Sequence, residues 1–283
     1  MPDTSTLNAL ADDPGRDALI PGLTSGYRIR LPFTAVSEVI ATTSGARRKE
    51  LLKICRRLLL SGDCVAPHQE IIRVTVAQFE QLGRLDHTRL PLRVEEAEKE
   101  ITSDEVFDED LAMEEREHGR THNKTFVSMY AEAKRAFDKL AAEGVSMPGS
   151  VAELVIQLQQ GGAFWTIARD LYDRVAKNPS DDAIIREFYA ACPPFRAILI
   201  AIVTAQYDRC IRAPNAGPSL KAGRNDTFMA ACLPYCDVFV TNDDGQLVCY
   251  RQVVSIAEIR VNVLSYHEFQ SGLLVMPTPS THR

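Results

Sequence analysis

A long middle stretch of the sequence shows apolar residues at helical spacing, without the alternation typical of strands. It separates two parts in which strand and helix patterns follow one another. This arrangement predicts an α/β domain that is interrupted by an all-helical insertion. We place the first half of the domain at residues 1–75, the insertion at 76–190 and the second half at 191–283.

The strand patterns in the outer parts are short. Tyr27–Phe33 alternates apolar and polar residues, and Asp237–Thr241 and Arg260–Leu264 are further strand candidates. Helical patterns surround them, with the expected ranges 35–41, 46–60, 193–211 and 227–233. Because strands alternate with helices, we expect a parallel sheet flanked by helices.

Composition excludes several classes of protein. The longest apolar run, Ala197–Val203, is far shorter than the ~20 residues that span a bilayer, and no secretory signal is present. The seven cysteines lack the spacing of a disulfide framework, which indicates reduced thiols and a cytoplasmic protein without a membrane partner. A net charge of −6 argues against binding nucleic acid through overall charge, although a local basic track remains compatible with it.

Two metal-site patterns are weak. Cys232, Cys236 and Cys249 suggest zinc, but no fourth ligand stands at the usual spacing, so buried thiols are the preferred interpretation. His118 and His122 are four residues apart, as a metal pair requires, yet they lie in a charged segment without the Glu of the zincin motif. We interpret them as part of a solvated helix surface.

Carboxylates at the expected ends of strands and helices are the stronger candidates. Asp226 is placed to cap a helix, Asp243 follows the strand candidate at 237–241, Glu38 follows the strand candidate at 27–33, and Asp3 precedes the first helix. Ligands of parallel α/β sheets bind at the carboxyl ends of the strands, so these four acids are expected to meet there. Clustered carboxylates favour Mg²⁺ or Mn²⁺.

Three segments together resemble PIN-domain nucleases. Arg224–Asp244 is similar to the C-terminal signature of that family, in which an acid opens a helix and an apolar strand ends in Thr-x-Asp. Asp3–Asn8 resembles the opening Asp-Thr-Ser motif, and Ala35–Glu38 resembles the segment that carries the family's Glu. The resemblance implies a PIN-like parallel sheet and a metal-dependent nuclease.

The same resemblance implies the site. Asp3, Glu38, Asp226 and Asp243 would be the catalytic, metal-binding acids, with Asp244 as a substitute for Asp243, and Ser5, Asn225 and Thr241 would support them. The bound Mg²⁺ or Mn²⁺ would activate a water for phosphodiester hydrolysis, with single-stranded RNA as the expected substrate. Basic residues that could carry its phosphates are Lys49, Lys53, Arg56, Arg57, Lys221 and Arg224.

Two features depart from the family pattern. Only Met1 and Pro2 precede Asp3, too few for a strand of ~5 residues, so we expect residues upstream or a domain that lacks its first strand, with Asp3 poorly held. The helical insertion is not part of a minimal PIN domain, and twelve acids between Glu95 and Glu117 would repel nucleic acid. The insertion could be a lid, a dimerisation arm or a partner-binding element.

Two alternatives to a nuclease stay open. The chain could be a catalytically inactive PIN-like scaffold that binds RNA or a protein partner through its insertion. It could instead be an α/β phosphohydrolase that acts on small phosphate esters.

Overall fold

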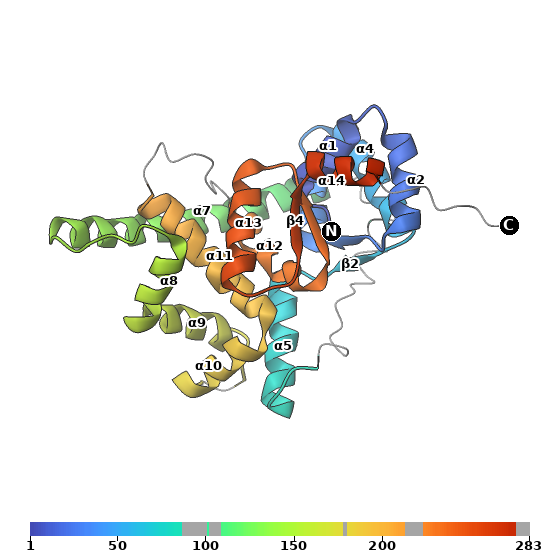
Figure 1. Cartoon of the computed structure of the whole chain (residues 1–283). Helices are drawn as coiled ribbons and strands as arrows, with labels where there is room; N and C mark the ends of the chain where they lie inside the picture. The colour runs from blue at the N-terminus through green and yellow to red at the C-terminus, as the bar shows by residue number, and fades with distance from the viewer. Residues whose placement is uncertain (87–100, 102–108, 178–179, 213–222, 276–283) are drawn as a thin grey trace.

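Helices dominate the structure. The computed structural model describes residues 1–86, 101, 109–177, 180–212 and 223–275 (Figure 1). In these ranges the strands are three or four residues long and form two separate two-stranded sheets. The expected α/β architecture, a PIN-like parallel sheet flanked by helices, is therefore wrong, and the protein is mostly helical.

Both sheets are parallel. β1 (Arg30–Pro32) pairs with β2 (Asp63–Val65), and β3 (Val238–Thr241) pairs with β4 (Asn262–Ser265). Pro2 adds an isolated parallel bridge to Val240. These strands are short because helices take up the neighbouring residues.

The segment expected to form the first long strand shows this competition. Tyr27 already serves as the C-cap of the preceding helix, and Phe33 begins the next one. Between them only Arg30–Pro32 remains as strand. The alternating pattern of Tyr27–Phe33 is therefore overridden at both ends by helices.

The first part of the chain forms five helices. The helix expected at residues 46–60 is one of them, and its Leu51, Leu52 and Cys55 are inaccessible to solvent. The five helices are α1 (Thr4–Asp12), α2 (Arg16–Gly26), α3 (Phe33–Ile40), α4 (Gly45–Leu59) and α5 (His68–Leu82).

After α5 and before residue 193, every element that the structure describes is a helix. A long helix leads away from the centre of the molecule and three shorter ones follow at the lower left of Figure 1. They are α7 (Glu109–Ala142), α8 (Val151–Gln160), α9 (Ala163–Asp173) and α10 (Asp182–Ala191). The buried Arg48 of α4 donates a hydrogen bond of 2.6 Å to Glu109, which fixes the start of α7.

The last part of the chain surrounds a central helix, α11 (Pro193–Cys210). Most of its side chains are buried, and it packs against helices of all three parts of the chain. The other helices here are α12 (Arg224–Met229), the 3₁₀ helix η3 (Ala230–Tyr235), α13 (Asp244–Ile256) and α14 (Tyr266–Val275). One hydrophobic core joins residues from the whole sequence, including Leu7, Phe188 and Phe239.

In the described residues, no single helix is both long and apolar enough to cross a bilayer. α10 and α11 reach the required length and composition only together, and they are bent by 103° at their junction.

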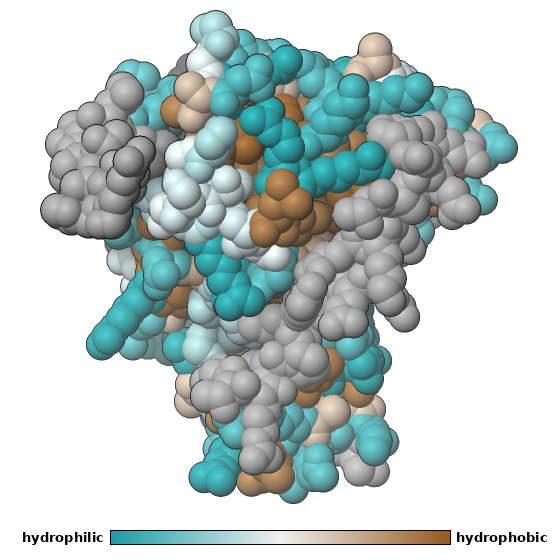
Figure 2. All heavy atoms as spheres, turned by 90° about the vertical axis from the view of Figure 1, so that its right-hand side faces the viewer, coloured by the Kyte–Doolittle hydropathy of each residue, from teal (hydrophilic) through white to brown (hydrophobic). Residues whose placement is uncertain are grey.

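The surface on the right-hand side of Figure 1 is mainly hydrophilic (Figure 2). Hydrophobic groups are visible there in small areas between polar ones. Larger exposed apolar side chains occur on α7, where Met113 and Met129 are more than half exposed.

Candidate functional site

Asp3 is buried and firmly held. It caps α1 by accepting a 2.7 Å hydrogen bond from the backbone N–H of Thr6, and only 3% of its surface is exposed. The hydroxyls of Ser5 and Thr241 also donate to it, at 2.8 and 2.7 Å. Burial raises the pKa of this carboxyl, and the hydrogen bonds oppose that effect. The expectation that Asp3 is poorly held is therefore wrong.

Glu38 lies on α3 and faces α1 and α12. Its carboxylate accepts hydrogen bonds from the hydroxyl of Thr4 and, at 3.1 Å, from the side-chain amide of Asn225. Burial raises the pKa of Glu38, and the charge of Asp3 adds to the increase. Three segments that are distant in sequence thus meet at this side chain.

Asp226 is the third residue of α12, not its N-cap. Its Oδ2 accepts a 3.0 Å hydrogen bond from the backbone N–H of Gly223, the residue that does cap the helix. Burial raises the pKa of Asp226 to about 7, and the charges of Glu38, Asp243 and Asp3 contribute to the increase.

Asp243 occupies the N-cap of α13. Its Oδ1 accepts a 2.7 Å hydrogen bond from the backbone N–H of Gln246, and its side chain is exposed. Its own backbone N–H donates to the Thr241 hydroxyl at 3.1 Å. Asp244, the first residue of α13, is also exposed.

Thr241 connects these parts. It ends β3 fully buried, and its hydroxyl lies 3.2 Å from that of Ser5. Ser5 in turn accepts a 2.7 Å hydrogen bond from the backbone N–H of Asn242. The supporting residues predicted from the sequence, Ser5, Asn225 and Thr241, all contact the acids or one another.

The donor set matches a hard divalent cation in chemistry, because it consists of carboxylate, hydroxyl and amide oxygens. In the ranges that the structure describes, however, no three side chains of His, Cys, Asp or Glu are grouped closely enough to hold a metal ion. Binding would require the carboxylates to move closer together. Cys232, Cys236 and Cys249 likewise belong to no group of three such side chains in the described ranges, and none of them forms a disulfide. Burial raises the pKa of Cys236 to about 11.

Glu38 and Asp226 open into a pocket of about 510 Å³. Residues of α3, α5, α7 and α12 line it. Three arginines and three histidines take part in this lining: Arg116, Arg120, Arg224, His68, His118 and His122. We call this space the carboxylate pocket.

An aromatic stack supports one wall of the carboxylate pocket. The imidazole of His68 stacks on the ring of Phe228, with centroids 4.4 Å apart and planes inclined by 18°. The guanidinium of Arg224 lies 5.3 Å from the Phe228 centroid and 3.5 Å from Nε2 of His68. Burial, followed by the charge of Arg224, lowers the pKa of His68 to about 3.

The predicted phosphate-binding residues are only partly brought to this place. Arg224 lines the carboxylate pocket, but the α4 side chains Lys49, Lys53, Arg56 and Arg57 do not. Arg56 donates to the backbone carbonyl of Ile101 at 2.6 Å, and Arg57 pairs with Asp17 at 2.8 Å. Lys221 lies outside the described residues, as does much of the acidic segment that begins at Glu95.

The histidine pair on α7 is more than a solvated helix surface. The rings of His118 and His122 are 4.2 Å apart, and both residues line the carboxylate pocket. His118 is exposed, as predicted, whereas His122 is half-buried. The prediction was incomplete because it could not include the packing of α7 beside α3 and α12.

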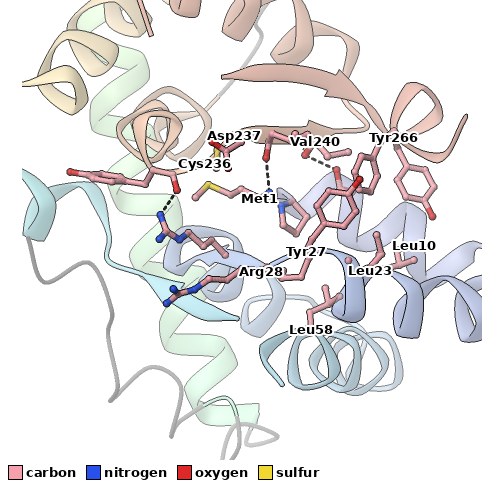
Figure 3. A pocket seen from close by; sticks show the side chains of 18 of the residues that line it. Met1, Leu10, Leu23, Tyr27, Arg28, Leu58, Cys236, Asp237, Val240 and Tyr266 are labelled. Carbon is pink, nitrogen blue, oxygen red and sulfur yellow. Dashed lines mark hydrogen bonds between the residues drawn. The ribbon is translucent and has the colours of Figure 1, made fainter. Parts of the chain in front are cut away.

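A larger cavity, of about 810 Å³, borders the N-terminal segment (Figure 3). Met1 and Val240 border it, and Leu10, Leu23 and Leu58 make its apolar floor. None of the four predicted acids lines it. Its size alone therefore does not make it the better candidate for carboxylate chemistry.

Several residues of the site were not predicted. Thr4 binds Glu38, the buried Gln246 lies 2.7 Å from Thr241, and the Tyr250 hydroxyl donates to the backbone carbonyl of Asp226. Thr4 belongs to the motif Asp3–Asn8, but nothing in the sequence indicates that it binds Glu38. Gln246 stands three residues after Asp243, a spacing typical of capping boxes.

Comparison of the chain with protein-family models, with curated proteins and with solved structures finds no match.

Proposed function

We propose that the protein is a metal-dependent nuclease that hydrolyses phosphodiester bonds, acting as an endoribonuclease on single-stranded RNA. The observation that carries this proposal is the hydrogen bonding around the four acids: the Thr241 hydroxyl binds both Asp3 and the backbone N–H of Asp243, and Asn225, the residue before Asp226, binds Glu38. Their partners are hydroxyl and amide groups, which orient the carboxylates without neutralising them. The likeness of the same motifs to PIN-domain nucleases stays a prediction that agrees with this function.

The cation would be Mg²⁺ or Mn²⁺, held by Asp3, Glu38, Asp226 and Asp243, with Asp244 able to replace Asp243. Such an ion lowers the pKa of water and stabilises the charge that develops on a phosphodiester. The chain's own contribution is to hold the acids in place. Thr4 and Asn225 fix Glu38, and Thr241 fixes Asp3.

An inactive scaffold that binds RNA or a protein partner is the second candidate. It is favoured by the spacing of the acids, because no three of those in the described ranges lie close enough together to hold one metal ion. A protein partner or a second copy of the chain would find apolar side chains on α7, where Met113 is 58% and Met129 59% exposed. These residues support an interaction through the insertion.

The cytoplasm is the compartment that we propose for this activity. None of the seven cysteines, all of which lie in the described residues, forms a disulfide, and thiols stay reduced in that compartment.

Cleavage of labelled single-stranded RNA in Mn²⁺ tests the proposal. We expect cleavage by the wild type, and its loss in EDTA and in the double variant Asp226→Asn/Asp243→Asn. Asp138→Asn is the matched control, because Asp138 is an exposed acid of α7 paired with Lys134. It should cleave as the wild type does.

Three results would contradict the proposal. A folded wild type that leaves RNA intact would favour the scaffold, and calorimetry would then show whether Mn²⁺ binds at all. Hydrolysis of p-nitrophenyl phosphate without RNA cleavage would indicate a phosphohydrolase. Cleavage by the double variant would place the active site elsewhere.

A further inference from the structure

The carboxylate pocket is lined by side chains of both charges. Its acids are Glu38 of α3, Glu115 of α7 and Asp226 of α12. Its arginines, which we call the arginine wall, are Arg116 and Arg120 of α7 and Arg224 of α12. A phosphodiester carries one negative charge, so it is attracted to the arginine wall and repelled by the acids unless a cation lies between them.

The α7 part of the arginine wall follows one helix face. Arg116, Arg120 and Asn123 are spaced by four and three residues, which places them in a row along α7. Arg116 already forms a 2.6 Å ion pair with Glu109. Arg120 is 3.9 Å from Glu117, and both of these side chains are more than 70% exposed, so little energy is needed to separate them.

Arg224 is the α12 part of the wall. It is half-buried beside the His68–Phe228 stack, and no acid in the described ranges forms an ion pair with it. Burial, followed by the charge of Arg174, lowers its pKa. An arginine with a rigid fork of donors and no carboxylate partner is suited to bind a phosphate.

Asn123 fixes the two parts of the wall to each other. Its side-chain carbonyl accepts a 3.1 Å hydrogen bond from the backbone N–H of Arg224. The insertion thus contributes directly to the pocket that contains Glu38 and Asp226.

We propose that Arg120 of α7 and Arg224 of α12 bind the phosphates of a single-stranded RNA and hold it against the carboxylates. This substrate-binding role of the insertion rests on the nuclease function proposed above. His68, whose imidazole stacks on Phe228, also lines the pocket beside Arg224. The strand would cross the pocket between α7 and α12, away from the basic face of α4.

The test is RNA binding without cleavage. Anisotropy of a labelled 12-nucleotide single-stranded RNA is measured with the full chain in EDTA, for the wild type, Arg120→Gln, Arg224→Gln and the double variant. We expect each single variant to weaken binding several-fold and the double variant about tenfold or more. The slope of log affinity against log salt should fall by about 1.4 in the double variant, since each phosphate contact on a single strand contributes ~0.7.

Arg135→Gln is the matched control. Arg135 is exposed on the same helix but outside the carboxylate pocket, and its substitution changes the net charge equally. It should bind RNA as the wild type does. Arg120 is also exposed, so a loss of binding in Arg120→Gln reports a contact and not unfolding.

The outcomes separate this inference from the nuclease proposal. Equal affinity of wild type, Arg120→Gln and Arg224→Gln would overturn the arginine wall, even if Asp226-dependent cleavage is observed. Weakened binding in both variants without cleavage by the wild type would support the wall as an RNA site and contradict the nuclease. Equal weakening by Arg135→Gln would show a general charge effect and would also overturn the inference.

Discussion

The side-chain amide of Asn225 donates a 3.1 Å hydrogen bond to Oε1 of Glu38. This bond joins α12 to α3, two helices separated by most of the chain. An uncharged donor at this position orients the carboxylate and leaves its negative charge available to a cation.

Asn225→Asp should destabilise the protein at pH 7 in the absence of metal. It replaces the donor by a carboxylate that repels Glu38, and we expect a loss of about 1–3 kcal/mol in the free energy of unfolding. Urea denaturation with and without Mn²⁺ measures the effect. Mn²⁺ should recover part of the loss, and Asn225→Ala, which removes the donor without adding charge, should lose less. Equal stability of the two variants without metal would show that a carboxylate at position 225 does not repel Glu38, and would contradict this prediction.

Thr241→Val should destabilise the protein by about 1–3 kcal/mol, because the buried Asp3 carboxylate loses its 2.7 Å hydroxyl donor. Thr204→Val is a matched control. Thr204 is equally buried, but its hydroxyl binds only the backbone of its own helix, at Ile200, so less than about 1 kcal/mol is expected. Thermal or urea unfolding of both variants compares them. The same small change in each would argue against a special role for Thr241.

Gly62→Ala should disrupt the pairing of β1 with β2. A Cβ at residue 62 would lie 1.8 Å from the backbone carbonyl oxygen of Ile29, a contact that only backbone displacement can relieve. We expect a loss above about 3 kcal/mol or failure to fold. Gly119→Ala, in the middle of α7 with nothing within 4 Å of the added Cβ, should instead be neutral or stabilise the protein by up to about 1 kcal/mol. Circular dichroism during thermal unfolding distinguishes these results.

His68 should remain neutral in the folded protein at pH 5. Its pKa of about 3 lies below the ordinary value of 6.5, so the unfolded chain takes up a proton in this window that the folded chain does not. The free energy of unfolding contributed by this group is therefore fully present above pH 6.5 and is lost as the pH falls toward 3. His68→Asn should show a weaker decrease of stability between pH 7 and 4.5. NMR can follow the ring protons of His68, whose signal is identified because it is missing in His68→Asn. A midpoint of its titration near pH 6 would contradict the prediction.

Local patterns predicted the helices well. The helices expected at 46–60 and 193–211 are observed as α4 (Gly45–Leu59) and α11 (Pro193–Cys210). Their ends differ from the expected ones by no more than one residue. The strands were predicted less well, because neighbouring helices compete for the same residues, as Tyr27 and Phe33 show.

The carboxylates could be found from sequence because each lies at a local signal such as a cap or a turn. Asn225 was expected among the supporting residues, but the donor Thr4 was not, because it reaches Glu38 only when α1 packs against α3. The place of Arg120 in the carboxylate pocket depends on how α7 packs against α3 and α12, which helical periodicity does not determine.

The hydrogen bond from Thr241 to Asp3 spans 238 positions of the sequence. At a synthesis rate of about 5–20 residues per second, roughly ten to fifty seconds separate the appearance of its two partners on the ribosome. For most of this interval Asp3 and Glu38 are present without Asp226, and Asp243 is made only after Thr241. A nascent chain with the proposed activity would therefore leave its own messenger intact until the segment around Thr241 has been made.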